Sequence, residues 1–228
     1  MGVDVVEQLG NGIKILNSSS ADLDDKEEAL DLLEDWVGQI DMAANFHKIG
    51  GYTALASCLE SPHPSLRAGA AHLAAECGQN NEYCQERFVK EGFLDRFLRQ
   101  VDGDSDDTAR VKGLYAVSCI CREYPAGLVE LARLDGWSVV VRAVQSDVKK
   151  LRTKACFFLS AVAPTDQLIQ QVRREKIRWQ QQLLTLCYNC PGAVEYGNGG
   201  AVVRVVTATA RRDSRARPGQ PAHARQEQ

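Results

Sequence analysis

The chain of 228 residues lacks any run of about 18 apolar residues, and residues 1–12 lack the basic start and apolar stretch of a signal peptide. The first absence excludes a transmembrane helix, and the second predicts a cytoplasmic protein. An excess of charge of one sign is also missing, because the net charge is only −3. The sequence therefore predicts no general attraction to nucleic acid or to membranes.

Motifs that carry chemistry are equally scarce. Eight cysteines are spread over residues 58–190 without a paired framework, which predicts reduced, mostly buried thiols. Cys187 and Cys190 form one CxxC pair, whereas a structural zinc site needs about four ligands. The acidic run Asp102–Asp107 lacks a glycine and a terminal glutamate at the spacing of an EF-hand calcium loop. We therefore predict a protein that is not an enzyme and that has no cofactor or metal.

Two markers recur along the chain with a period of about forty residues. The first is a glycine followed by an aromatic residue, at Gly51-Tyr52, Gly92-Phe93 and Gly136-Trp137, with spacings of 41 and 44. The second is a small or apolar residue followed by arginine, at Leu66-Arg67, Ala109-Arg110 and Leu151-Arg152, with spacings of 43 and 42. Armadillo and HEAT repeats have this length, with two or three helices each.

The residues between the markers have helical spacing. From Leu66 to Cys77, apolar residues recur at intervals of three and four, and no strand-like alternation occurs before residue 190. We expect the glycine to form a sharp corner between two helices and the following aromatic residue to fill the core beneath it. The predicted fold is all-α, an armadillo-type right-handed helical solenoid of about three and a half repeats.

Composition suggests three segments. Residues 1–22 are expected to form a lead-in helix and a serine-rich linker, and residues 23–190 the repeat domain. Its repeats are expected at 23–61, 62–104 and 105–147, with a partial fourth from Val148. No glycine marker occurs near residue 178, where the period would place one. Residues 191–228 are rich in Arg, Gly and Pro and are expected to be a disordered tail.

Four stretches carry a more specific resemblance. They are Glu28–Leu33 with Asn45-Phe46, Leu66–Asn80, Asp107–Cys119 and Leu131–Val139. Through them, residues 3–163 resemble the heat-shock-protein-70-binding family of armadillo co-chaperones, the cytosolic nucleotide exchange factors of the 70-kDa heat-shock chaperone. The resemblance implies a monomer that binds the nucleotide-binding domain of that chaperone and promotes ADP release without catalysis. A general armadillo adaptor for other proteins is the alternative.

The third helix of an armadillo unit lines the concave surface, so we expect the partner-binding residues there. The candidates are Arg67, His72, Glu76, Arg110, Lys112, Tyr115, Lys154 and Phe157. Importin-type units place a Trp and, four residues later, an Asn on this helix, and this chain has no such pairs. The sequence therefore argues against binding of nuclear-localisation peptides. The two aromatic candidates could instead be core residues, and the charged ones a solvated face.

Overall fold

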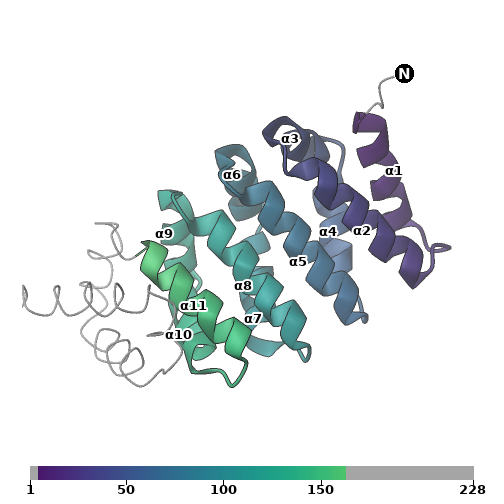
Figure 1. Ribbon diagram of the computed structural model, residues 1–228. Coiled ribbons are helices and arrows are strands. Elements are labelled where there is room, and N and C mark those ends of the chain that lie inside the picture. The colour runs from purple at the N-terminus through teal and green to yellow at the C-terminus, as the bar shows by residue number, and fades with distance from the viewer. Residues whose placement is uncertain (1–4, 163–228) are drawn as a thin grey trace, which may run out of the picture.

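A row of helices makes up residues 5–162, the part of the chain that the computed structural model describes (Figure 1). Two helices come first, α1 (Val5–Asn17) and α2 (Leu23–Val37). Three units of three helices follow: α3 (Ile40–Lys48), α4 (Gly51–Leu59) and α5 (Pro64–Gly78); α6 (Glu82–Lys90), α7 (Phe93–Gly103) and α8 (Asp107–Cys121); α9 (Pro125–Arg133), α10 (Gly136–Gln145) and α11 (Lys149–Val162). Residues 5–162 contain no strand, as the sequence predicts.

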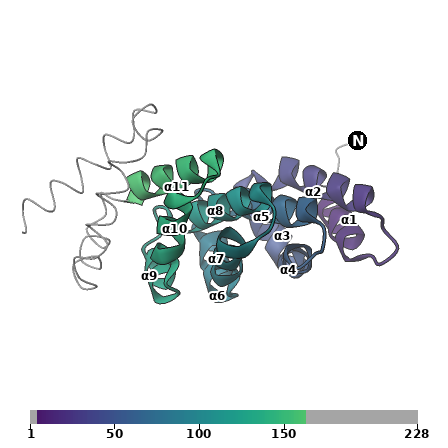
Figure 2. The same cartoon turned by 90° about the horizontal axis from the view of Figure 1, so that it is seen from below.

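The helices form two layers. α2, α5, α8 and α11 lie side by side (Figure 1), and α4, α7 and α10 pack against the back of α5, α8 and α11 (Figure 2). Grouped in this way, each unit ends with its long helix. The predicted repeat boundaries start each unit at that helix. Residues 163–190 of the predicted repeat domain and the predicted tail, 191–228, lie outside the described residues.

The corner between the two shorter helices is built on a left-handed backbone. Gly50 has φ 93°, Gly92 has φ 75° and Asp135 has φ 53°. Gly92 is thus the corner that the sequence predicts, but Gly51 and Gly136 are not. They are the first residues of α4 and α10, where a Cβ would lie 2.5 Å from the ring of Phe46 or 2.4 Å from Leu131. The prediction was wrong there because close packing, not backbone freedom, requires those glycines.

The aromatic residues after the corners fill the core, as expected. Tyr52, Phe93 and Trp137 are 2%, 3% and 8% exposed. Tyr52 stacks on Phe88 with 4.1 Å between ring centroids, and Trp137 stacks on Phe158 at 6.0 Å. The first contact joins one unit to the next, because Phe88 belongs to α6, and the second joins α10 to α11 within the last unit. The core is therefore continuous along the described helices.

Other features of residues 5–162 limit the kinds of site they could hold. No described helix is long and apolar enough to cross a membrane. No cluster of three or more His, Cys, Asp or Glu side chains in this part of the chain could hold a metal ion. The cysteines of the described helices are free thiols, and all but Cys156 are buried. Cys187 and Cys190 lie outside the described residues.

Candidate partner-binding face

The outward sides of α2, α5, α8 and α11 form one continuous surface, which we call the concave face. Its side chains reach from helix to helix. His72 on α5 lies between two carboxylates: its Nδ1 is 2.8 Å from Glu34 Oε2 on α2, and its Nε2 is 3.5 Å from Glu76 Oε1 one turn further along α5. Its imidazole therefore joins the first two helices of the face.

Tyr115 extends this network to the third and fourth helices. Its hydroxyl lies 3.0 Å from Glu76 Oε1 and 3.1 Å from Gln79 Oε1, and its ring centroid is 5.8 Å from that of His72. Lys154 Nζ on α11 stands 4.3 Å from the centre of the same ring, a cation–π contact. Burial, then the nearby Cys119 and Glu76, raises the pKa of Tyr115. The tyrosine therefore stays a neutral phenol at physiological pH and can donate to Glu76.

Lys112 and Phe157 flank this network. Burial lowers the pKa of Lys112, with a smaller contribution from Lys154, while the charges of Glu34 and Glu76 act in the opposite direction. Phe157 is 46% exposed, which is unusual for a phenylalanine, and the Arg122 guanidinium lies 5.8 Å from its ring centre. The face thus combines fixed charges with an apolar contact point.

Six of the eight predicted residues belong to this face: His72, Glu76, Lys112, Tyr115, Lys154 and Phe157. Sequence reasoning missed Glu34, Gln79 and Arg122. Gln79 and Arg122 stand seven residues after His72 and Tyr115, so extending the helical pattern by two turns finds them. Glu34 gives no comparable signal, because its place beside His72 depends on how α2 packs against α5.

Arg67 and Arg110 were placed on the binding surface, and the structure gives them another role. The side chain of Arg67 donates to the carbonyl oxygens of Ser61 (2.9 Å) and Pro62 (3.1 Å), and Arg110 Nε donates to that of Val101 (3.0 Å). Arg152, the third arginine marker, donates to Ser146 O at 2.7 Å. Arg110 and Arg152 thus satisfy a carbonyl at the end of the preceding helix, where the helix itself offers no partner, and Arg67 satisfies two carbonyls of the loop that follows α4.

Arg67 is also held by a carboxylate. Its Nε and Nη2 each lie 2.7 Å from an oxygen of Asp104, and the two side chains are 15% and 5% exposed. The hydrogen bonds from Arg67 lower the pKa of Asp104. A bidentate pair of this kind fixes both groups. Arg67 and Arg110 therefore stabilise the fold, and we leave them out of the candidate face.

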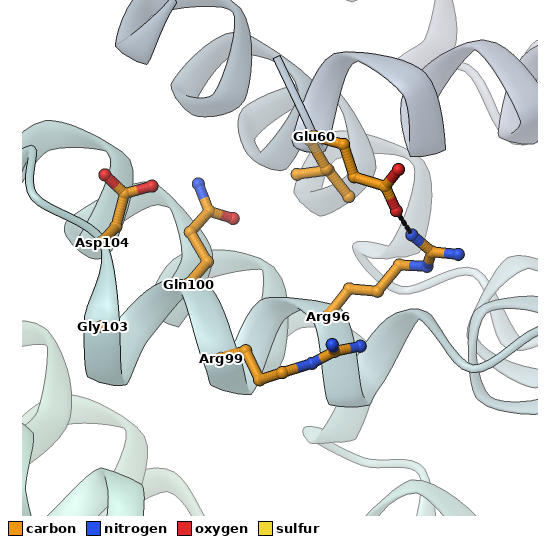
Figure 3. Close-up of a pocket in the computed structure, with 7 residues that line it drawn as sticks. Glu60, Arg96, Arg99, Gln100, Gly103 and Asp104 are labelled. Carbon is orange, nitrogen blue, oxygen red and sulfur yellow. Dashed lines mark hydrogen bonds and ion pairs between the residues drawn. The ribbon is translucent and has the colours of Figure 1, made fainter. Parts of the chain in front are cut away.

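A pocket of about 300 Å³ lies between the end of α4 and α7 (Figure 3). Its charged side chains already have partners within the chain. Arg96 pairs with Glu60, as Figure 3 shows, Arg99 pairs with Asp95, and Asp104 pairs with Arg67. No charge remains there to select a ligand, so the concave face is the better candidate for function.

Two protein-family models together match the whole described region. The family model described as "SIL1/FES1/HPBP1 C-terminal domain" matches residues 42–189, and the model "Nucleotide exchange factor Fes1" matches residues 1–46. The armadillo fold also has solved counterparts. A designed armadillo repeat protein superimposes with a TM-score of 0.72 at 14% identity, covering 87% of this chain and 82% of that one. This likeness confirms the predicted fold class.

Individual relatives agree with the family match. Hsp70-binding protein 1 of Rattus norvegicus is 36% identical over 208 residues, which cover 80% of this chain and 58% of the relative. The Homo sapiens protein of the same name is 35% identical with the same coverage. The Hsp70 nucleotide exchange factor FES1 of Debaryomyces hansenii is 29% identical over 181 residues, covering 77% of this chain and 63% of the relative. The chain thus spans less than two thirds of the length of these relatives.

Proposed function

Because the chain belongs to the SIL1/FES1/HPBP1 family, we propose that it binds the nucleotide-binding domain of a 70-kDa heat-shock chaperone and promotes release of ADP. The observation that carries the proposal is the match to two models of this family, which together cover residues 1–189. The names of the relatives, Hsp70-binding protein and Hsp70 nucleotide exchange factor, supply the partner and the activity. We further propose that the protein acts in the cytosol as a monomer and is not an enzyme.

The mechanism follows from differential binding. A ligand shifts a conformational equilibrium only by the difference between its affinities for the two states. The concave face would bind one lobe of the nucleotide-binding domain in its open arrangement and be incompatible with the closed arrangement that holds ADP. ADP then dissociates faster, and no bond is made or broken by this chain. The residues that we assign to the contact are His72, Glu76, Lys112, Tyr115, Lys154 and Phe157.

The test is the rate at which a fluorescent ADP leaves the chaperone in a stopped-flow experiment. Saturating amounts of the chain should accelerate release, whereas the chain alone should hydrolyse no ATP. Lys154→Glu, on the concave face, should weaken binding about tenfold, as removal of one well-placed interface charge typically does. Lys14→Glu is the matched control, because Lys14 is an exposed residue of α1.

An unchanged release rate at saturation contradicts the exchange activity. If the chain still binds the chaperone under those conditions, the adaptor function is favoured instead. Equal binding by the Lys154→Glu and Lys14→Glu variants would contradict the placement of the contact on the concave face. Circular dichroism of both variants separates loss of the contact from loss of the fold.

A further inference from the structure

Four equivalent positions recur on the helices of the concave face. On each helix they are spaced by four, three and four residues, so that they form one stripe. In order from α2 to α11 the stripes are Asp24, Glu28, Asp31 and Asp35; Ser65, Gly69, His72 and Glu76; Thr108, Lys112, Tyr115 and Cys119; Lys150, Lys154, Phe157 and Ala161. Only Cys119 among them is buried. The contacts of Tyr115 with His72 and Lys154 show that these stripes face one another.

The charge of the stripes changes steadily along the solenoid. All four positions on α2 are acidic, which gives −4, and the stripe on α5 has −1 from Glu76 when His72 is neutral. The stripe on α8 has +1 from Lys112, and the stripe on α11 has +2 from Lys150 and Lys154. The concave face therefore has a negative end and a positive end, although the net charge of the whole chain is close to zero.

Apart from Asp24, whose charge in the first turn of α2 interacts favourably with the helix dipole, the acidic stripe does not serve the stability of the described fold. None of its four carboxylates forms an ion pair within residues 5–162. Like charges three and four residues apart on a helix repel one another and destabilise it. The only basic residue of α2, Lys26, lies close enough to Cys58 on α4 for its charge to oppose the burial that raises the pKa of that thiol. The exposed carboxylates of this stripe are therefore available to pair with positive charges from outside residues 5–162.

The two ends are far enough apart to act separately. Neighbouring packed helices lie about 8–10 Å apart, so three steps from α2 to α11 span roughly 25–30 Å. The screening length at physiological ionic strength is about 8 Å. A charge on the partner therefore senses the stripe directly opposite it and little of the other end. The two ends of the face can therefore attract charges of opposite sign at the two ends of one partner surface.

We propose that this gradient fixes the orientation of the bound partner, whose surface carries basic groups opposite α2 and acidic groups opposite α11. The inference rests on the proposed function, since it concerns the same concave face and the same chaperone domain. Tyr115 on α8 contacts the middle of that surface, and Phe157 on α11 contacts its acidic side. A partner turned end for end would place like charges together at both ends, which is strongly unfavourable.

The test compares association of the full chain with the chaperone's nucleotide-binding domain after neutralisation of either end. Asp31→Asn with Asp35→Asn removes two charges from α2, and Lys150→Gln with Lys154→Gln removes two from α11. Each pair should slow association about tenfold at low salt, since complementary charges act mainly on the association rate. The differences should disappear in about 1 M salt, where the screening length is about 3 Å. The α2 variant should be at least as stable to heat as the wild type.

Matched controls carry the same charge changes away from the face. Asp41→Asn with Glu82→Gln removes two negative charges at the starts of α3 and α6, and Lys14→Gln with Lys48→Gln removes two positive charges from exposed positions on α1 and α3. These variants should associate at the wild-type rate. If the wild-type chain binds but either face variant associates at the wild-type rate, the orienting role of the gradient is wrong. The proposed exchange activity is not affected by that result. Failure of the wild-type chain to bind the chaperone domain overturns the proposed function and the gradient with it.

Discussion

At the scale of single residues, the arginine markers show how one side chain can look functional and be structural. Arg67, Arg110 and Arg152 recur with the repeat period on exposed-looking helical positions, which favours a binding role in a sequence. In the structure each donates to a backbone carbonyl of the preceding loop or helix end. A periodic charged residue can thus mark a repeated structural bond as well as a repeated binding site.

Asp104→Asn should reduce stability by about 1–3 kcal/mol, because it leaves the largely buried guanidinium of Arg67 without its carboxylate. The pKa of Asp104 is lowered in the folded chain, chiefly by the hydrogen bonds from Arg67. Its contribution is therefore complete above the unfolded pKa of about 3.9 and is lost as the pH falls through the lower folded-state pKa. Urea unfolding from pH 7 to pH 2 measures this difference between wild type and variant.

Asp95→Asn is the control for that experiment, since Asp95 pairs with Arg99 on the surface of α7. It should change stability by no more than about 0.5 kcal/mol. A wild-type advantage over Asp104→Asn that persisted undiminished at pH 2 would contradict the ion-pair explanation.

At the scale of the element, the corner between the shorter helices depends on one residue with positive φ. Gly50 and Gly92 occupy it in the first two units, and Asp135 occupies it in the third. Asp tolerates this backbone better than most residues do, and here Asp135 Oδ1 accepts a hydrogen bond from Ser138 Oγ at 2.7 Å. The same turn is therefore reached by two different chemical means.

Gly92→Ala should reduce stability by about 1 kcal/mol, because alanine at φ 75° brings its Cβ against the backbone although no other atom lies within 4 Å. Gly10→Ala is the matched control: it lies within α1, has open space around the added Cβ, and should stabilise by about 0.5–1 kcal/mol. Opposite signs of the two changes in thermal unfolding are the expected result. Equal effects would show that backbone conformation does not decide the outcome.

These corners also show what the sequence could and could not predict. The period, the helices and the buried aromatic residues follow from local spacing, and Tyr52, Phe93 and Trp137 lie in the core as expected. The corner residue was misassigned in two units because adjacent glycines serve different purposes, and an aspartate replaces glycine in the third. Six candidate face residues follow from helical spacing, whereas Glu34 required the packing of α2 on α5.

At the scale of the whole molecule, the described chain is a row in which each unit contacts chiefly its neighbours. Stability in such a row is a sum of terms from units and from the interfaces between them. A helix at the end can open without its neighbours, but a helix in the middle cannot. The position of a substitution along the row thus matters as much as its burial.

Leu114→Ala and Leu9→Ala test this, because both leucines are 0% exposed, one in the central α8 and one in the terminal α1. Loss of a buried leucine typically removes about 2–5 kcal/mol. We expect Leu114→Ala to speed amide exchange throughout α5 to α11, and Leu9→Ala to speed it mainly in α1 and α2. Hydrogen exchange read by mass spectrometry gives the pattern. A uniform increase in both variants would contradict the row description.

The bond from each arginine to the loop before it determines where such a row can be divided. Arg67 belongs to α5 but donates hydrogen bonds to residues 61–62. A chimera joined within that loop would therefore take the arginine and its carbonyl partners from different proteins. Asn80 and Glu123 instead mark turns between a long helix and the next unit, with φ 53° and 60°. Repeat units divided at these two turns keep each arginine together with the loop to which it donates. Chimeras that lengthen, shorten or shuffle this solenoid should therefore be joined at these two turns.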